Sequence, residues 1–260
     1  MDYRDVEHFK SKTGYDIDGT WVPRVTSIVN IKAKPALYYF YASLKNFQEG
    51  ERIKEKSAAE GTMVHETVQN LIVGKNPDID PSIKPAVDAA MRFIEEHNIV
   101  IDPDFIERRV VNKNDRYAGT TDALATIDGM LGVLDIKTSQ AIYRDYGLQT
   151  SAYVAALIDE VPKLSTRWIL RIDQHRICHK CGSIFRNKGG REKIRLPWDP
   201  KDRSARARAS VCEHEWSPVV GDVEIQEFKN WEKDYKAFLG AKRLWEWEND
   251  RWLREAGYLK

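Results

Sequence analysis

The sequence ATIDGMLG, residues 125 to 132, places an Asp-Gly pair at positions 128 and 129 between two apolar segments. Such a pair is the strongest short-range signal for a β-hairpin with a two-residue loop, because both loop residues must adopt positive φ. It predicts strands over about 119 to 127 and 130 to 137. Counting outward from the loop sets the cross-strand pairs: Ile127 with Met130, Leu124 with Val133, and Asp122 with Asp135. The expected register therefore sets two acidic residues opposite each other.

The opposed acids indicate a cation site. Directly opposed residues have Cβ atoms about 4.5 to 5.5 Å apart, and like charges so placed are destabilising unless something lies between them. Mg²⁺ binds oxygen ligands and typically uses one or two carboxylates. Lys137 lies two residues beyond Asp135 and shares its face of the strand. Two acids for a metal and an ammonium for a phosphate or a water predict phosphodiester hydrolysis; the alternative is a surface hairpin with a solvated lysine.

Two helices could bring further polar groups to the same place. Residues 145 to 162 predict a helix in which Gln149 and Tyr153, at i and i+4, share one face. An earlier helix, roughly residues 57 to 73, has apolar residues at helical spacing and Gly74 as its stop. His65 lies off the centre of its apolar stripe and could supply a further ligand. The agreement among separate segments favours the site over the surface hairpin.

Composition bounds the class of protein. A chain of 260 residues, 42% hydrophobic, is long enough for one domain over residues 1 to 260 that carries a small insert. Its 41 Lys+Arg balance 40 Asp+Glu, so any nucleic-acid surface must be local. The N-terminus lacks the apolar core of a signal peptide, and no apolar run approaches the length of a membrane span. We expect an intracellular, cytoplasmic protein with no membrane partner.

The remaining segments predict alternating helices and strands. Residues 21 to 30 are typical of a strand or extended segment, and residues 34 to 47 of a helix with Pro35 in its first turn. Residues 38 to 41 are all aromatic, which favours core packing over base stacking. Further predictions are a helix over 82 to 98, a strand over 105 to 111, paired strands over 164 to 172 and 222 to 228, and a closing helix from Phe228 with a core-facing aromatic stripe.

A cysteine-containing insert, residues 173 to 220, separates the last two strands. Its three cysteines are an odd number and favour a metal site in a reducing compartment over a disulfide framework. Cys178 and Cys181 form a C-x₂-C pair, and Cys212 and His214 a C-x-H pair. Four such ligands suit tetrahedral structural Zn²⁺. His175 or His179 could replace His214, and free cysteines in a loop are the alternative.

Basic residues concentrate in the same insert. Residues 186 to 208 contain nine Lys or Arg against Glu192, Asp199 and Asp202, a local balance of +6 in a chain of net +1. A solvated loop is the usual explanation of such a run, but a basic loop tied to zinc beside a nuclease site favours a phosphate clamp. We therefore expect Arg203, Arg206 and Arg208 to contact DNA.

Four motifs occur in order along the chain: GTMVH with His65, YAGTTD with Asp122, LDIKTS with Asp135 and Lys137, and QTSAY with Gln149 and Tyr153. The ordered set resembles the RecB-like exonuclease family of the PD-(D/E)XK nuclease superfamily, over about residues 20 to 172 and the closing strand. The resemblance implies an α/β fold of the PD-(D/E)XK nuclease type, a central mixed β-sheet flanked by helices, here with a small zinc-binding insert.

The resemblance also implies roles for individual residues. His65, Asp122 and Asp135 would hold Mg²⁺ or Mn²⁺ together with the backbone carbonyl of Ile136. Lys137 would position or activate the attacking water, and Gln149 and Tyr153 would contact DNA. Glu107 occupies a position where relatives often carry an acid. Some relatives bind an iron–sulfur cluster through four cysteines, one of them upstream of the motifs; three cysteines, all downstream, favour zinc here.

The expected function is therefore a metal-dependent deoxyribonuclease, more an exonuclease on DNA ends or single strands than a sequence-specific endonuclease. The resemblance places such enzymes in DNA repair or recombination, in the host cytoplasm if the chain is of phage origin. The alternative is a zinc-stabilised DNA-binding or assembly module on a degenerate nuclease scaffold. Nothing in the sequence indicates a protein partner.

Overall fold

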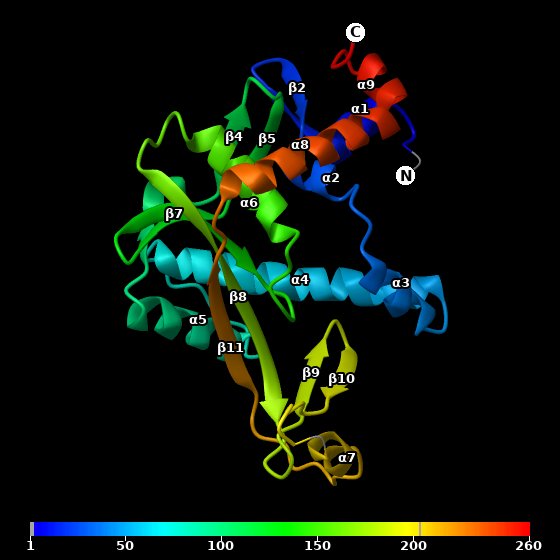
Figure 1. Cartoon of the computed structure of the whole chain (residues 1–260), viewed down its shortest axis with the longest axis vertical. Coiled ribbons are helices and arrows are strands. Elements are labelled where there is room, and N and C mark those ends of the chain that lie inside the picture. The colour runs from blue at the N-terminus through cyan, green and yellow to red at the C-terminus, as the bar shows by residue number, and fades with distance from the viewer. Residues whose placement is uncertain (1–2, 203) are drawn as a thin grey trace.

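The computed structural model describes residues 3–202 and 204–260, and its centre is a mixed seven-stranded sheet (Figure 1). The strands are β3 (Val100–Asp102), β6 (Ala123–Ile127), β7 (Met130–Lys137), β8 (Leu164–Ile177), β9 (Ile184–Lys188), β10 (Arg191–Arg195) and β11 (Val220–Glu227). Their order is β10-β9-β8-β7-β6-β3, with β11 paired to β8. Strands β7 and β8 are parallel, and the other neighbours are antiparallel. The predicted mixed sheet is confirmed.

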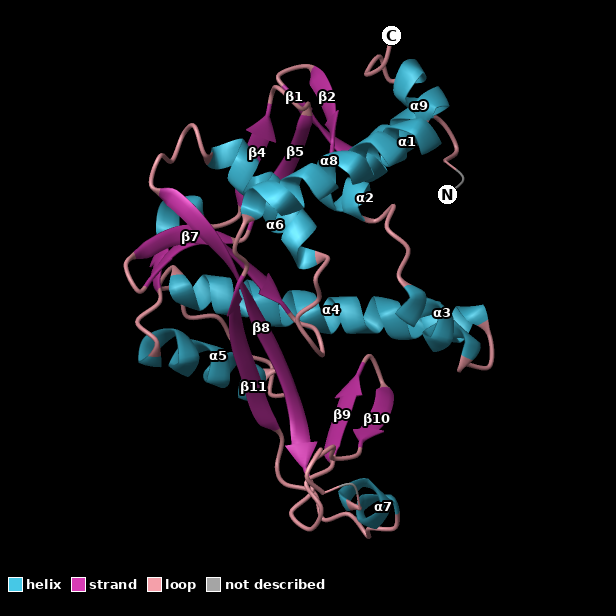
Figure 2. Cartoon of the chain, in the orientation of Figure 1, coloured by secondary structure: helices cyan, strands magenta, loops and turns pink. Residues whose placement is uncertain are grey.

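Helices flank both faces of this sheet (Figure 2). Helices α4 (Phe47–Ile72) and α5 (Lys84–Glu96) pack on one face, and α6 (Tyr146–Leu157) packs on the other with α8 (Trp231–Glu248) behind it. Helix α4 begins ten residues before the predicted start, because the Asn46 side chain caps it by accepting from the Glu49 amide. Among the described residues, no helix has both the length and the apolar character to cross a membrane.

The Asp-Gly hairpin forms, and the predicted register is confirmed except for the pair of Asp122 with Asp135, which lies outside the ladder. Asp128 and Gly129 have φ of 51° and 78°, and Ile127 pairs with Met130. The ladder continues through Leu124 and Val133 and ends at Ala123 with Leu134. Asp122 lies just outside it, in a bend between β6 and the preceding strand β5 (Tyr117–Thr121). This bend frees the Asp122 side chain from cross-strand pairing.

Alternation along β6 and β7 assigns their side chains to two separate cores. Leu124 and Val133 belong to the core beneath α6, whereas Ala123 and Leu134 belong to the core beneath α4 and α5. Asp135 and Lys137 follow Val133 at intervals of two residues and so share the α6 face. The end of β7 is therefore where both helical layers can reach the same charged residues.

Smaller elements complete the upper part of the molecule in Figure 1. They are α1 (Val6–Thr13), α2 (Val25–Val29), α9 (Asp250–Glu255), the 3₁₀ turn η1 (Pro103–Phe105), and two hairpins, β1 (Gly14–Ile17) with β2 (Thr20–Pro23) and β4 (Arg108–Asn112) with β5. The predicted strand over 21 to 30 is only partly right, since it ends at Pro23. Val25, Ile28 and Val29 then bury at helical spacing, which explains α2.

The aromatic residues of the first and last predicted aromatic helices differ in burial. Helix α3 (Pro35–Ala42) forms as predicted, but core packing of its aromatic residues is wrong: none of its residues is buried, and Tyr38 and Tyr39 are 66% and 79% exposed. The physical reason is that α3 packs along α4 at the margin of the fold, away from both cores (Figure 1). In α8, by contrast, Phe238 and Trp245 are buried, which confirms the predicted core stripe.

The insert extends the sheet. Strand β8 runs to Ile177, five residues past its predicted end, and β9 joins it through Arg176 with Phe185 and Ile177 with Ile184. Strands β9 and β10 form a hairpin around Gly189 and Gly190, and helix α7 (Ala205–Ser210) follows. The chain returns along β8 as β11, so the predicted pairing of those two strands is confirmed.

Candidate active site and cysteine cluster

One half of the candidate active site combines a histidine and two acids from three distant segments. His65 comes from α4, Glu107 from the residue before β4, and Asp122 from the bend before β6. Their ligand atoms all lie within 4.8 Å of one another. His65 Nε2 is 3.1 Å from Asp122 Oδ2, and His65 Nδ1 is 3.9 Å from Glu107 Oε1. Glu107, a secondary expectation from sequence, is thus a full member of this cluster.

Glu107 is held in place by two contacts. Its φ of 52° lies in the left-handed region, which is uncommon for a glutamate and persists where neighbouring contacts fix it. Its amide donates to the Asp122 carbonyl at 3.2 Å, and Gln69 Nε2 donates to its Oε1 at 2.6 Å. Gln69 is 8% exposed and was missed from sequence. The available signal was its position four residues after His65, on the same face of α4.

The other half of the site lies on the α6 face. Lys137 Nζ is 2.6 Å from Asp135 Oδ2, and Gln149 Nε2 donates to Asp135 Oδ1 at 3.0 Å. The ammonium of Lys137 also lies 5.3 Å from the centre of the Tyr146 ring. The two halves meet at Asp122, whose Oδ2 accepts from the Ile136 amide at 2.6 Å. Asp135 thus contacts the side chains of Lys137 and Gln149, whereas Asp122 contacts the His65 side chain and the Ile136 backbone amide.

Tyr153 requires a correction to the predicted DNA contact. The ring is 2% exposed and its hydroxyl accepts from Gln149 Nε2 at 3.0 Å. It packs over Gly119, where a Cβ would collide with the ring. Tyr153 therefore cannot offer a surface to DNA and instead orients Gln149, which stays half-buried beside Asp135.

Charges within the site set its protonation. Burial lowers the pKa of Lys137, but Asp135 and Asp122 outweigh burial and raise the pKa overall. Burial raises the pKa of Asp122, but His65 and Lys137 bring it below its usual value. Burial raises the pKa of Asp135 to about 6. Lys137 therefore stays an ammonium near neutral pH, so it can donate hydrogen bonds but cannot act as a base.

The donor set fits a divalent metal ion. Imidazole and carboxylate ligands suit Mn²⁺, and carboxylates suit Mg²⁺. Asp135 Oδ2 is buried and, among the described residues, receives no hydrogen bond of regular geometry despite its ion pair with Lys137. That oxygen therefore has a lone pair available for a cation. The Ile136 carbonyl, predicted by resemblance, stays a prediction.

A cavity gives access to the cluster. It measures about 490 Å³ and is lined by His65, Glu107, Asp122, Lys137 and Thr138. Gly61 of α4 also lines it, and a side chain there would collide with Thr138. The glycine therefore allows α4 to approach the segment that follows Lys137, which brings His65 within reach of Asp122.

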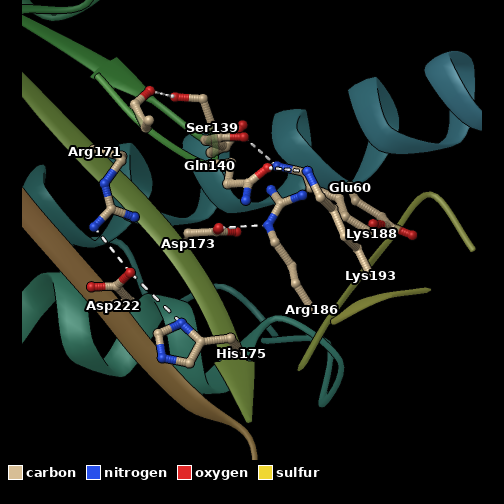
Figure 3. A network of polar contacts seen from close by, with 12 residues as sticks. Glu60, Ser139, Gln140, Arg171, Asp173, His175, Arg186, Lys188, Lys193 and Asp222 are labelled. Atoms are coloured by element: carbon tan, nitrogen blue, oxygen red, sulfur yellow. Dashed lines mark hydrogen bonds and ion pairs between the residues drawn. The ribbon is translucent and has the colours of Figure 1, made fainter. Parts of the chain in front are cut away.

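The β9–β10 hairpin is joined to this segment by a polar network (Figure 3). Lys188 Nζ donates to the carbonyl of Thr138, the residue after Lys137, and the Gly189 amide donates to Glu60 of α4 at 2.9 Å. Arg186 Nε pairs with Asp173 Oδ2 at 2.6 Å. Lys193 Nζ lies 3.5 Å from Gln140 Oε1. The insert therefore contacts the end of β7 directly.

The cysteine cluster forms as a second site at the end of β8. Ligand atoms of Cys178, Cys181, Cys212 and His214 all lie within 4.8 Å of one another. His214 Nδ1 is 3.4 Å from Cys181 Sγ, whereas His175 pairs with Asp222 at 3.6 Å, away from the thiols. Of the candidate histidines, His214 is thus the one that the fold brings to the cysteines.

The pKa values of the thiols are consistent with a bound cation at the cysteine cluster. Burial raises the pKa of Cys178, but hydrogen bonds from His214 and from the amides of Lys180, Cys181 and Glu215 bring it down to about 6. Burial and the neighbouring thiols raise the pKa of Cys212 to about 11. Three crowded sulfurs cannot all ionise without a positive charge among them, and the thiolate is the form that binds metal.

The arginines predicted to clamp phosphates lie apart from the active site. Arg206 and Arg208 are on α7, at the opposite end of the insert from the β9–β10 loop (Figure 1). Arg206 is exposed, and Arg208 Nη2 pairs with Asp202 Oδ2 at 2.5 Å. Arg203 lies outside the described residues. Within the insert, Lys188 and Lys193 of the β9–β10 hairpin are the basic residues that contact the segment after Lys137.

Comparisons with known proteins leave the family open. No family model matches the chain, and no curated protein matches it. A solved structure from Eubacterium rectale, provisionally named an exonuclease, is similar at 12% identity and TM-score 0.38, over 77% of this chain and 69% of that one. LHK-Exo in complex with dAMP is similar at 12% and 0.33, over 92% and 95%. SSO0001 is similar at 14% and 0.27, over 79% of each chain. At these values the likeness carries no argument about function, which must rest on the site itself.

Proposed function

We propose that this protein is a metal-dependent DNA nuclease that hydrolyses phosphodiester bonds, most readily at DNA ends or in single strands. The observation that carries the proposal is the cluster of His65, Glu107 and Asp122, within 4.8 Å, beside the ion pair of Asp135 and Lys137 at 2.6 Å. Both halves open onto or adjoin one cavity of about 490 Å³. Metal ligands next to a fixed ammonium are what phosphodiester hydrolysis requires.

In this proposal His65, Glu107 and Asp122 hold Mg²⁺ or Mn²⁺, and Asp135 and the Ile136 carbonyl complete the ligand set. The bound cation supplies positive charge that polarises the phosphodiester. Lys137 keeps its charge and donates a hydrogen bond that orients the attacking water or the phosphate. Gln149 fixes the Asp135 carboxylate through their 3.0 Å hydrogen bond. Tyr153 fixes Gln149 in turn.

The cysteine cluster has a different role in the proposal. Cys178, Cys181, Cys212 and His214 hold a structural Zn²⁺, which fits their thiolate and imidazole donors and their mutual distances. The zinc would fasten the far end of the insert, while the β9–β10 hairpin places Lys188 and Lys193 against the segment that follows Lys137. Arg191 of the same hairpin contacts Ser43 at the end of α3. Those cations support DNA as the substrate, because phosphate contacts supply most non-specific affinity.

The decisive experiment is a cleavage assay with 5′- and 3′-labelled oligonucleotides, single-stranded and duplex, with and without Mg²⁺ or Mn²⁺. The parent should degrade DNA only with metal, and the product ladder gives the polarity. Lys137→Met should lower the cleavage rate by about 10²- to 10³-fold, the usual range when one preorganised hydrogen-bond donor to the developing charge is removed.

Lys242→Met is the matched control, because Lys242 is also a buried lysine in an ion pair, with Glu246, but lies on α8. It should cleave at the parental rate after correction for any loss of stability measured by thermal melting. If the parent shows no metal-dependent cleavage on any substrate, the nuclease proposal fails. A zinc-stabilised DNA-binding or assembly module on a degenerate nuclease scaffold then becomes the better reading.

A further inference from the structure

A second cavity of about 490 Å³ lies on the α6 side of the candidate active site. The connection from α2 to α3 forms one wall, and residues 143 to 149 form the other. Its lining includes Val29, Lys34, Leu37, Tyr143, Tyr146 and Gln149. The volume falls within the roughly 300 to 1,000 Å³ of ligand pockets. None of the roles given above uses this cavity.

The cavity adjoins the reacting groups through two of its lining residues. Tyr146 lines it and also lies 5.3 Å from Lys137 Nζ, measured to the ring centre. Gln149 lines it and donates to Asp135 at 3.0 Å. The first cavity lies on the other side, where Lys137 is a lining residue. A strand whose phosphate reaches Lys137 therefore has room for a neighbouring nucleotide in the second cavity.

The walls have the chemistry of a base pocket. Tyr143 is 49% exposed and packs edge-on to Tyr146, with ring centres 5.7 Å apart. Three cations, Lys32, Lys34 and Arg144, line the cavity. Lys32 pairs with Asp145 at 2.7 Å and Arg144 lies 3.5 Å from Asp234, so among the described residues Lys34 is the cation of this wall without an ion pair. Aromatic rings offer faces on which bases stack, and a cation without an acidic partner offers a contact for a phosphate.

We propose that this cavity receives an unpaired base of the cleaved strand, next to the phosphate at Lys137, with Tyr143 as its stacking surface. A base can enter such a cavity only when it is free of its complementary strand, because a paired base is held within the duplex stack. The inference deepens the nuclease proposal and rests on it: the substrate class becomes single-stranded DNA or a frayed end.

The test measures equilibrium binding of fluorescent oligonucleotides to protein carrying Asp122→Asn, which prevents cleavage. Adding Tyr143→Ala should weaken binding of a ten-nucleotide single strand by roughly 5- to 150-fold, the equivalent of about 1 to 3 kcal/mol for one stacked base. Tyr143→Phe should restore binding. Trp247→Ala, which removes a 74% exposed aromatic residue on α8, should leave it unchanged.

A scan with one abasic position moved along the strand identifies the base. At one position the abasic strand should bind weakly to the Asp122→Asn protein, and adding Tyr143→Ala should cause no further loss of affinity. Equal effects of Tyr143→Ala and Trp247→Ala, an equal loss for a blunt duplex, or no single-strand binding by the parent would each overturn the inference. Metal-dependent cleavage by the protein with Asp122 intact is followed in parallel. If it persists while binding is insensitive to Tyr143, only the cavity assignment fails.

Discussion

The acidic cluster around Asp122 and the cysteine cluster around Cys181 both hold their ligand atoms within 4.8 Å of one another, but they are built differently. The acidic cluster draws His65, Glu107 and Asp122 from segments that meet only when the helical layers close on the sheet. The cysteine cluster draws its residues from two short stretches at the end of a single strand pair. One depends on the whole fold, the other on the insert alone.

Their surroundings differ as well. The acidic cluster opens onto a cavity that Lys137 also lines, with the Lys137 ammonium held in an ion pair by Asp135. The cysteine cluster is packed against Trp216, whose ring centre is 4.6 Å from that of His214. Catalytic metal sites keep an open position for substrate, whereas structural zinc sites close with four protein ligands. This contrast supports the proposed roles, catalysis at the acidic cluster and a structural metal at the cysteine cluster.

The largest expected effect is on metal content. Cys181→Ser and His214→Ala should each reduce zinc from about one per chain to near zero, because structural zinc binds with an apparent free energy of about 10 to 16 kcal/mol that needs all four ligands. His179→Ala is the control and should retain zinc, since its contact with the described residues is a backbone hydrogen bond from its amide to the Glu215 carbonyl. Elemental analysis decides. Brown protein containing iron and sulfide would contradict the assignment.

The next effect concerns the acidic cluster. Gln69→Ala removes the donor to Glu107, and such supporting contacts typically change metal affinity or activity by about 10- to 100-fold. We expect the Mn²⁺ concentration for half-maximal cleavage to rise by that factor, with the rate at saturating Mn²⁺ largely restored. Gln48→Ala, an exposed glutamine on the same helix, is the control. A loss of rate that Mn²⁺ does not relieve would remove Gln69 from the metal site.

A third prediction tests whether the two regions are independent. Lys188→Met removes the insert's hydrogen bond to the Thr138 carbonyl, next to Lys137. Because the bond positions the segment next to Lys137, and misplacing a reacting group by about 1 Å can cost about 10²-fold in rate, the maximal cleavage rate should fall by about tenfold or more. Zinc content and the Mn²⁺ requirement should stay unchanged. Lys201→Met, an exposed lysine of the same insert, should behave as the parent. Parental rates for Lys188→Met would make the insert a separate module.

Much of the acidic cluster was predictable because local patterns encode it. Asp128-Gly129 fixed the register, the strand alternation placed Asp135 and Lys137 on one face, and His65 had the helical position required. The prediction of Glu107 was weak, and Gln69 was missed. Their hydrogen bond depends on a positive φ at Glu107 and on helix packing, and a single segment of sequence reveals neither. The direct DNA contact of Tyr153 was wrong because burial is a tertiary property.

In the insert, the candidate ligands were predictable but the secondary structure was not recognised. Its four candidate ligands were predictable from their spacing, and the fold brings His214, the preferred one of the three candidate histidines, to the thiols. The β9–β10 hairpin was missed although Gly189-Gly190 is a recognised two-residue turn signal. As a consequence, the basic residues were assigned to a loop, and those on α7 were chosen over the ones that reach the active site.

The smallest expected effect is on the salt dependence of DNA binding. It distinguishes the basic residues of the β9–β10 hairpin from those of α7. Each phosphate contact to a single strand changes the slope of log affinity against log salt by roughly 0.7. Replacing Arg191 and Lys193 by alanine should flatten the slope by up to about 1.4 on that basis. Replacing Arg206 and Arg208 should change it less, because Arg208 is already paired with Asp202 and α7 lies at the far end of the insert. Equal flattening by both pairs would mean that DNA follows the insert as far as the cysteine cluster. The zinc would then hold part of the DNA surface, and the separation of the two regions into chemistry and stability would no longer hold.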